Sequence, residues 1–357
     1  MLFSPLSLGE LELPNRLVMA PLTRVRTGKE GIPGPLVVEH YRQRASLGLI
    51  VSEGTYPSPA GRSYPGQPGL ITPEQIAGWK TVTDAVHAEG GRMFAQIMHG
   101  GRVSHEDITG GHQIVGPSPV AIDGETRTYS GKQPYPVPRE LSTDELPVVI
   151  QEFVTASRNA IEAGFDGVEL HSANGYLLHE FLAPNTNVRT DSYGGSPENR
   201  ARFVIEAVNA VVEALGANRV SIRISPQHNV QGIEETDAAD VRATYEVLVN
   251  SIAPLNLAYL SILHDDPSGE LVQDLRARFN GTFLVNTGFG AITSREDAIS
   301  LITDGHADAV VVGRPAIANP DLARRWREGL PLNEPDQATF YGEGAKGYTD
   351  YPEYQPA

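Results

Sequence analysis

The chain has 357 residues, of which 40% are hydrophobic and 20% charged, a composition typical of a globular protein with a large core. Its formal net charge of −16 argues against binding to the phosphate backbone of nucleic acids and to anionic membrane surfaces. The complete absence of cysteine excludes disulfides, cysteine nucleophiles, thiolate zinc sites and iron–sulfur clusters.

The N-terminal stretch lacks the basic and apolar regions of an export signal. No apolar run in the chain approaches the roughly 20 residues that span a bilayer. We therefore expect a cytoplasmic protein without a membrane partner. Within residues 1–16, the sequence Leu8-Gly9-Glu10-Leu11 predicts a small hairpin, which we expect to plug the bottom of a barrel.

Short apolar runs alternate with helical patterns from one end of the chain to the other. Most of these runs are apolar on both faces, as parallel strands buried beneath helices should be. The eight predicted strands are Leu17–Met19, Leu49–Val51, Met93–Ile97, Gly167–Leu170, Val220–Ile224, Ala258–Ile262, Phe283–Val285 and Ala309–Val312.

Several of the intervening helices carry recognisable start and stop residues. Thr72 and Gln75 have the spacing of a capping box, with a proline in the first helical position. Pro147 must kink or restart the helix in which it lies. The predicted helices cover residues 72–90, 142–164, 199–215 and 293–305.

Eight strand–helix units in about 300 residues predict an α/β fold, a (β/α)₈ TIM barrel, which we expect to form one domain over residues 1–357. A doubly wound sheet is the alternative, but no Gly-x-Gly-x-x-Gly follows the first strand. Residues 100–141, after the third strand, are rich in Gly, Pro and polar residues. A structureless stretch of that length predicts a lid or binding loop over the site.

In such a barrel the functional residues follow the C-terminal ends of the strands. The fourth strand leads into His171, Asn174 and Tyr176, which we interpret as catalytic residues. Two of these hydrogen-bonding groups can hold an oxygen of a substrate, while the third donates a proton at high pKa. The alternative for His171 and Tyr176 is that they are half-buried core residues with satisfied polar atoms.

Other strand ends predict a site for a phosphorylated, planar cofactor, and flavin mononucleotide (FMN) fits this description. Glycine-rich turns and an arginine after strands seven and eight can bind a phosphate. Arg223, between two isoleucines on strand five, is expected to point into the barrel mouth, where a salt bridge to Glu169 or Glu53 is its alternative role. The residues at these strand ends are Ala20, Pro21, Leu22, Thr23, Gly54, Gln96, Arg223, Gly288, Phe289, Gly313 and Arg314.

Three longer segments carry a resemblance to a known family. The sequence from His171 through Asn174 and Tyr176, the stretch 187–200 and the C-terminal stretch 340–352 all resemble the Old Yellow Enzyme family of FMN-dependent ene-reductases. Short motifs such as Ala20-Pro21-Leu22-Thr23 and Gly313-Arg314-Pro315 extend the resemblance over essentially the whole chain. The C-terminal stretch is similar to the bacterial pentaerythritol tetranitrate reductase and N-ethylmaleimide reductase branch.

The resemblance implies a role for individual residues. It implies that FMN is bound by the strand-end residues given above, that His171 and Asn174 hold the activating oxygen of the substrate, and that Tyr176 is the proton donor. Tyr64 and Tyr341 match positions that line the substrate pocket. Met98 stands where the closest relatives mostly carry tryptophan, so a flexible side chain is expected to reshape the pocket.

The resemblance also implies the reaction. FMN would accept a hydride at N5 from NADPH or NADH and pass it to an activated C=C bond in a ping-pong cycle. The implied substrates are small electron-poor alkenes, namely α,β-unsaturated carbonyls, maleimides and nitroalkenes, with nitrate esters as a further class. The sequence leaves the coenzyme preference and the choice between monomer and homodimer open.

Three other interpretations compete with this one. A non-catalytic FMN-binding barrel would have no need for Tyr176 beside His171 and Asn174. A metal-dependent barrel hydrolase could use His99, His171 and His179, but the chain has no His-Glu-x-x-His motif and we expect no metal. Multidomain dienoyl-CoA reductases share the barrel but require cluster-binding cysteines, which this chain lacks.

Overall fold

A closed barrel of eight parallel strands forms the centre of the protein, seen in a computed structural model that describes residues 1–356. The eight strands pair in chain order, and β14 closes the barrel by pairing with β3. The predicted (β/α)₈ TIM barrel is therefore confirmed. The barrel strands are β3 (Leu17–Met19), β4 (Leu49–Val51), β5 (Met93–Ile97), β10 (Gly167–Ser172), β11 (Val220–Ile224), β12 (Tyr259–Leu263), β13 (Phe283–Asn286) and β14 (Ala309–Val312).

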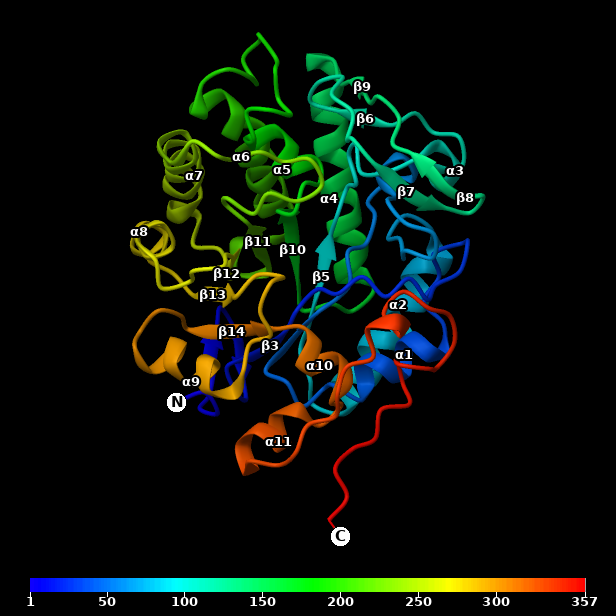
Figure 1. Ribbon diagram of the computed structural model, residues 1–357, viewed down its shortest axis with the longest axis vertical. Coiled ribbons are helices and arrows are strands. Elements are labelled where there is room, and N and C mark those ends of the chain that lie inside the picture. The colour runs from blue at the N-terminus through cyan, green and yellow to red at the C-terminus, as the bar shows by residue number, and fades with distance from the viewer. Residues whose placement is uncertain (357) are drawn as a thin grey trace.

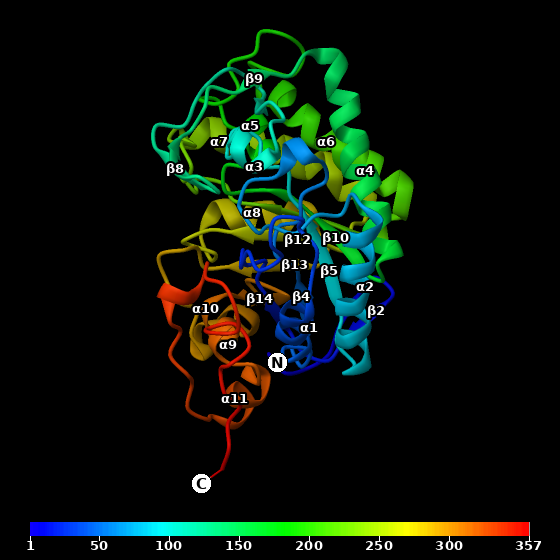
Figure 2. The same ribbon diagram turned by 90° about the vertical axis from the view of Figure 1, so that its right-hand side faces the viewer.

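Helices surround the strands on the outside (Figures 1 and 2). Their apolar faces pack on the outward-facing side chains of the strands and form the largest hydrophobic cluster of the protein. The helices of this layer are α1 (Pro35–Arg42), α2 (Pro73–Ala88), α4 (Leu146–Glu162), α5 (Leu177–Leu182), α6 (Pro197–Leu215), α7 (Ala238–Ile252), α8 (Glu270–Phe279), α9 (Arg295–Thr303), α10 (Arg314–Ala318) and α11 (Leu322–Glu328).

The helix starts follow from the capping residues, with small shifts from the predicted positions. Thr72 and Gln75 form the expected capping box at the start of α2. A 3₁₀ turn over residues 143–145 precedes α4, and Pro147 lies in the first turn of that helix, so the proline restarts the helix rather than kinking it. Ser196 and Ser294 cap α6 and α9, so α6 starts two residues before the predicted Asn199.

The fourth barrel strand is longer than predicted. The sequence suggests that it ends at Leu170, but β10 continues to Ser172 and pairs with β11 from Val168 to Ser172. His171 therefore lies on the strand itself, directly opposite Arg223 in the parallel register, and not in the following loop. The apolar pattern of the sequence stops at Leu170 because the last two residues of the strand, His171 and Ser172, are polar.

An N-terminal hairpin closes the bottom of the barrel, as predicted. It consists of β1 (Leu6–Leu8) and β2 (Leu11–Leu13), paired antiparallel. Leu8 and Leu13 are fully buried and belong to the same cluster as the inward-facing residues of the barrel. The hairpin thus fills the bottom of the barrel interior with apolar side chains.

The excursion after β5 is a lid, but it is not structureless. It contains a short helix, α3 (Glu106–Thr109), and an antiparallel hairpin of β7 (Glu125–Thr128) and β8 (Gly131–Pro134). Two further short strands, β6 (Val115–Gly116) and β9 (Arg139–Glu140), pair in parallel and hold the two ends of the excursion together. These elements lie together beside the upper end of α4 (Figure 1).

None of the helices described for residues 1–356 combines the length and the apolar character that crossing a membrane requires.

Replacing the barrel plug should cost stability. We expect Leu8→Ala to lower the free energy of unfolding by about 2–5 kcal/mol, because it removes a fully buried side chain and leaves a cavity among the inward-facing residues. Denaturant unfolding followed by circular dichroism measures this change. Leu332→Ala is the matched control: Leu332 is 43% exposed, so its truncation should change stability by no more than about 0.5 kcal/mol. Equal effects of the two substitutions would contradict the claim that the buried hairpin stabilises the barrel.

Candidate active site

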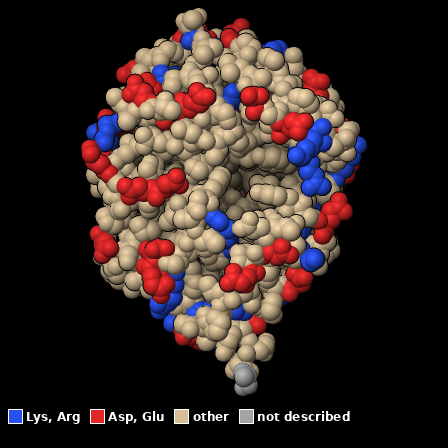
Figure 3. All heavy atoms as spheres, viewed as in Figure 1, with Lys and Arg blue, Asp and Glu red and all other residues tan. Residues whose placement is uncertain are grey.

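A cavity of about 1070 Å³ opens at the C-terminal ends of the barrel strands. The space-filling view shows it as a hollow on this face (Figure 3). Its wall combines strand ends, the lid hairpin and a C-terminal segment that contributes Phe340 and Tyr341. The sequence-predicted site residues that line it are Ala20, Pro21, Leu22, Thr23, Tyr64, Gln96, Met98, His171, Asn174, Tyr176, Arg223, Gly288, Phe289, Gly313, Arg314 and Tyr341.

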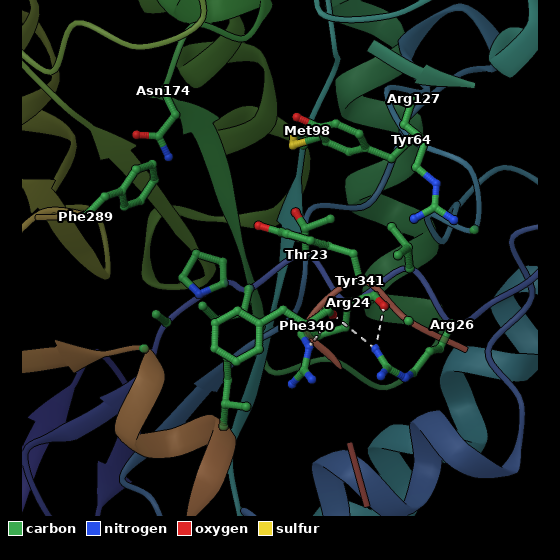
Figure 4. A pocket seen from close by; sticks show the side chains of 18 of the residues that line it. Thr23, Arg24, Arg26, Tyr64, Met98, Arg127, Asn174, Phe289, Phe340 and Tyr341 are labelled. Carbon is green, nitrogen blue, oxygen red and sulfur yellow. Dashed lines mark hydrogen bonds between the residues drawn. The ribbon is translucent and has the colours of Figure 1, made fainter. Parts of the chain in front are cut away.

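Gly54 is the predicted site residue that does not line this cavity. It packs behind Met98, and a Cβ atom at position 54 would come within 2.5 Å of the Met98 sulfur. Its carbonyl accepts a hydrogen bond from Gln67 Nε2 at 2.9 Å. Glycine at this position therefore makes room for the side chain of Met98, which in turn faces the cavity (Figure 4).

His171 presents a neutral imidazole at the barrel mouth. The side chain is 4% exposed, and its Nδ1 atom has no hydrogen-bond partner within the described chain. Burial, reinforced by the positive charge of Arg223, lowers the pKa of His171 well below its ordinary value. A neutral imidazole has one N–H to donate, so His171 can bind an oxygen atom in the cavity.

Asn174 lies in the left-handed backbone region, at a φ of +57°. Asparagine tolerates this conformation better than most residues. The backbone is fixed on both sides, since its N–H donates to Ser225 Oγ at 2.9 Å and its carbonyl accepts from Gln231 Nε2 at 2.6 Å. The side-chain oxygen has no partner among the described residues. The loop after β11 thus holds the backbone and leaves the amide group available.

Tyr176 follows two residues later, at the start of α5. Its hydroxyl lies 2.8 Å from the hydroxyl of Tyr64, and its ring contacts the edge of the His171 ring at a centroid distance of 4.8 Å. Burial raises the pKa of Tyr176 above its ordinary value, and the hydrogen bond from Tyr64 lowers it in part. Both phenols therefore remain protonated at neutral pH.

Arg223 brings a buried cation without a direct ion-pair partner into the barrel. It is 3% exposed, and its Nε and Nη1 atoms have no partner within residues 1–356. The neighbouring Glu169 instead accepts hydrogen bonds from Gln96 Nε2 at 2.8 Å and from the Tyr259 hydroxyl at 3.0 Å. The predicted alternative of a salt bridge to Glu169 is therefore wrong for the described chain. Burial lowers the pKa of Arg223, and the nearby Glu169 carboxylate offsets part of that decrease.

Glu53, the other predicted ion-pair partner of Arg223, instead binds the main chain. One oxygen of this buried carboxylate accepts the backbone N–H groups of Arg24 and Val25, both at 3.0 Å. Val25 has a φ of +53°, which is a strained conformation for a β-branched residue. Glu53 thus fixes the loop that follows β3 and carries Thr23.

The loops after β13 and β14 are tied to each other. Arg314 Nη2 donates to the carbonyls of Phe289 and Ala291, at 2.5 and 2.8 Å. The Phe289 ring is 54% exposed and meets the edge of the His228 ring at 4.7 Å. Arg314 therefore orders the glycine-containing turn in which a phosphate site is predicted.

Within residues 1–356, no group of three or more His, Asp or Glu side chains is placed to hold a metal ion. His179 does not line the cavity with His171, because its Nε2 lies 3.2 Å from Glu235 Oε1 in the protein interior.

A comparison with protein families identifies the chain. The model of the NADH:flavin oxidoreductase / NADH oxidase family matches residues 1–333. The chain belongs to this family.

Relatives and solved structures agree with this assignment. A "Probable flavin mononucleotide-dependent alkene reductase" from Leishmania infantum is 41% identical over 360 residues, covering 98% of this chain and 97% of that relative. Morphinone reductase in complex with tetrahydroNAD superposes with a TM-score of 0.93 at 44% identity, over 99% of this chain and 98% of that one. An old yellow enzyme homologue from Zymomonas mobilis superposes with a TM-score of 0.93 at 38% identity, over 99% of both chains. The protein is a flavin oxidoreductase enzyme of the Old Yellow Enzyme type.

Some parts of the cavity of this flavin oxidoreductase were not predicted from its sequence. Gln231 belongs to the loop after β11, and Arg127 and Tyr135 belong to the lid. Lone polar residues in long loops carry no motif that marks them. Only their position, after a barrel strand or in a long excursion, could have indicated them.

The C-terminal segment, residues 336–350, is held against the barrel by two arginines from the loop after β3. Arg24 donates to the carbonyls of Phe340 and Gly347, and its guanidinium lies 5.0 Å from the centre of the Tyr348 ring. Tyr348 also stacks on His40 at a centroid distance of 3.9 Å. Figure 4 shows the result, with Arg24 and Arg26 beside Phe340 and Tyr341 at the edge of the cavity.

Arg26 should control how firmly this segment is docked. Its guanidinium donates to four carbonyls of the segment, those of Thr339, Phe340, Gly344 and Lys346. We expect Arg26→Ala to accelerate tryptic cleavage after Lys346 about tenfold or more, because losing hydrogen bonds from a charged donor costs about 1.5–3 kcal/mol and raises the open population accordingly. Mass spectrometry of the native digest measures the rate.

Arg92→Ala is the control for this experiment. Arg92 also donates to carbonyls, those of Gly90 and Gly91, but on a distant turn. Its replacement should leave cleavage after Lys346 unchanged. A wild-type cleavage rate in the Arg26→Ala variant would mean that other contacts hold the segment.

Proposed function

We propose that this flavin oxidoreductase is an FMN-dependent ene-reductase, which uses reduced nicotinamide coenzyme, NADPH or NADH, to reduce activated C=C bonds of small electron-poor alkenes. The substrate classes are α,β-unsaturated carbonyls, maleimides and nitroalkenes. One observation carries the proposal: a single strand and its following loop bring a neutral imidazole, a free amide and a protonated phenol, from His171, Asn174 and Tyr176, to one wall of the cavity. A non-catalytic flavin-binding barrel would not require this combination.

The cavity suits FMN because unpaired donors lie where its polar groups would bind. Arg223 would bind the pyrimidine side of the ring, where charge develops on reduction, since its Nε and Nη1 atoms are buried without partners. Gln96 would pair with the ring amide, and its orientation is set by the hydrogen bond to Glu169. The turns at Gly288 and Gly313 together with Arg314 would hold the phosphate.

FMN, when bound, supplies hydride transfer between the nicotinamide and the alkene. The protein must do the rest, which is to orient the alkene and to handle the proton. The structure of morphinone reductase with tetrahydroNAD supports a nicotinamide coenzyme as the reductant in this family.

His171 and Asn174 would bind the carbonyl or nitro oxygen of the alkene. Both are nearly fully buried, so a hydrogen bond from either acts in a medium of low polarity. Because His171 is neutral, it polarises the oxygen by donating a hydrogen bond rather than by transferring a proton. Such donors, aimed at developing negative charge, are worth about 3–4 kcal/mol in comparable sites.

Tyr176 would protonate the α-carbon. A phenol is a weak acid, and burial makes this one weaker still. It is nevertheless sufficient, because the enolate-like carbon that it meets is a strong base. A group that stays protonated through neutral pH also remains ready to donate in every turnover.

Removing the phenol should separate the two halves of the reaction. We expect Tyr176→Phe to slow alkene reduction about 10²- to 10⁴-fold, the usual contribution of a general acid. Flavin reduction by NADH or NADPH should stay close to the wild-type rate, because no protein proton is needed there. Stopped-flow absorbance of the flavin, with 2-cyclohexenone as the oxidant, measures both steps. An equal loss in both would refute the role of Tyr176.

Removing the buried cation should weaken flavin binding. We expect Arg223→Ala to lower the affinity of the protein for FMN about tenfold to a hundredfold, since a hydrogen bond from a charged donor contributes about 1.5–3 kcal/mol. Fluorescence titration of the apoprotein with FMN measures the affinity, and circular dichroism checks that the barrel remains folded. Undiminished affinity and an unchanged rate of flavin reduction would assign Arg223 a purely structural role.

A further inference from the structure

Tyr64 makes a hydrogen bond to the proposed proton donor. Its hydroxyl lies 2.8 Å from that of Tyr176, and the two residues are 112 positions apart in the sequence. In Figure 4 the Tyr64 ring extends into the cavity beside Met98. Either hydroxyl can donate while both phenols are neutral. Once Tyr176 has lost its proton, only Tyr64 can donate.

The barrel holds Tyr64 in place through the fully buried side chain of Gln67. Gln67 Oε1 accepts the backbone N–H groups of Ser63 and Tyr64, at 2.8 and 3.3 Å. Gln67 Nε2 donates to the carbonyl of Gly54, directly after β4. The turn that carries Tyr64 is therefore tied to the end of a barrel strand, so the phenol has a defined position relative to Tyr176.

The surroundings of Tyr176 offer little else to stabilise a negative charge. The imidazole of His171, whose ring edge it contacts, is neutral. The uncharged amide of Gln231 lowers the pKa of Tyr176 in the same direction as Tyr64 does, while its Nε2 donates to the Asn174 carbonyl at 2.6 Å. The titratable and polar groups that face it are Tyr64 from the loop after β4, Tyr135 from the lid, His171 from β10, Gln231 from the loop after β11 and Tyr341 from the C-terminal segment.

We propose that Tyr64 is a positioning residue for the proton transfer: it orients the Tyr176 phenol and donates the hydrogen bond that stabilises the phenolate formed when the alkene is protonated. This inference rests on the proposed function, in which Tyr176 is the acid. In that step the O–H bond of Tyr176 breaks and a C–H bond forms at the α-carbon, whose electron pair comes from the enolate-like substrate. The phenolate then regains a proton from solvent before the next turnover.

The proposal predicts an unusual combination of effects for Tyr64→Phe. Tyr176 must be protonated to act, so the rate of alkene reduction falls as the pH rises through its pKa. The hydrogen bond from Tyr64 lowers that pKa by stabilising the phenolate. Without the bond Tyr176 is a weaker acid, so the reaction is slower at neutral pH while its basic limb moves to higher pH.

The experiment is stopped-flow reoxidation of the reduced holoenzyme by 2-cyclohexenone over a range of pH. For Tyr64→Phe we expect alkene reduction to be about tenfold to a hundredfold slower at neutral pH, the range of a hydrogen bond to a charged group. We also expect the basic limb of the pH–rate profile to lie about one pH unit or more higher than in the wild type. The solvent deuterium isotope effect on alkene reduction should be larger. Flavin reduction by NADH should change less than about twofold, since this step does not involve the Tyr176 proton.

Tyr193→Phe is the matched control, because it also removes a hydrogen-bonding phenol, one that donates to Glu206 Oε2 at 3.0 Å, but at a position outside the cavity wall. It should leave the position of the basic limb unchanged. A Tyr64→Phe variant whose basic limb coincides with that of the wild type overturns the proposal, whether or not its rate has fallen, because losing a hydrogen bond that stabilises the phenolate must raise the pKa of Tyr176.

Tyr176→Phe separates this inference from the function on which it rests. Wild-type alkene reduction in that variant would disprove the role of Tyr176 as the acid, and the role of Tyr64 with it. Slow reduction in Tyr176→Phe together with an unmoved limb in Tyr64→Phe would leave the proposed function intact and reject only the positioning role.

Discussion

The parallel pairing of β10 with β11 is the constraint on which the site depends. Its register places His171 opposite Arg223 inside a closed barrel, where neither side chain reaches bulk solvent. Two cations on neighbouring strands in a medium of low polarity would repel each other strongly, so the arginine keeps its charge and the histidine remains neutral. A slip of β10 by one residue would point the His171 side chain out of the barrel and leave Arg223 without this neighbour.

The rest of the site is built outward from this pair. The loop after β11 fixes the backbone of Asn174 through Ser225 and Gln231, while Glu53 fixes the strained backbone at Val25 on the opposite side. In each case a buried polar group binds the main chain and leaves the functional side chain free. The flavin oxidoreductase therefore obtains a rigid first layer of side chains from loops rather than from strands alone.

Local signals in the sequence were sufficient for the barrel and for most of the cavity wall. The capping box of Thr72 and Gln75 and the apolar strands are short-range patterns that the fold preserves. What the sequence could not provide were contacts between distant segments. The docking of Arg24 on the carbonyls of Phe340 and Gly347 joins positions more than 300 residues apart and depends on main-chain acceptors, which leave no trace in side-chain identity. The lid hairpin was missed because its strands are short and polar.

The contact between Gly54 and Met98 has a consequence for altering this pocket. A Cβ atom at position 54 would collide with the Met98 sulfur, so a side chain at position 54 would force the Met98 side chain to move. The two positions are thus sterically linked, and substitutions at one change what the other tolerates. A mutant library that reshapes the cavity through position 98 should therefore keep Gly54 constant, so that each new side chain at position 98 is compared in the same space.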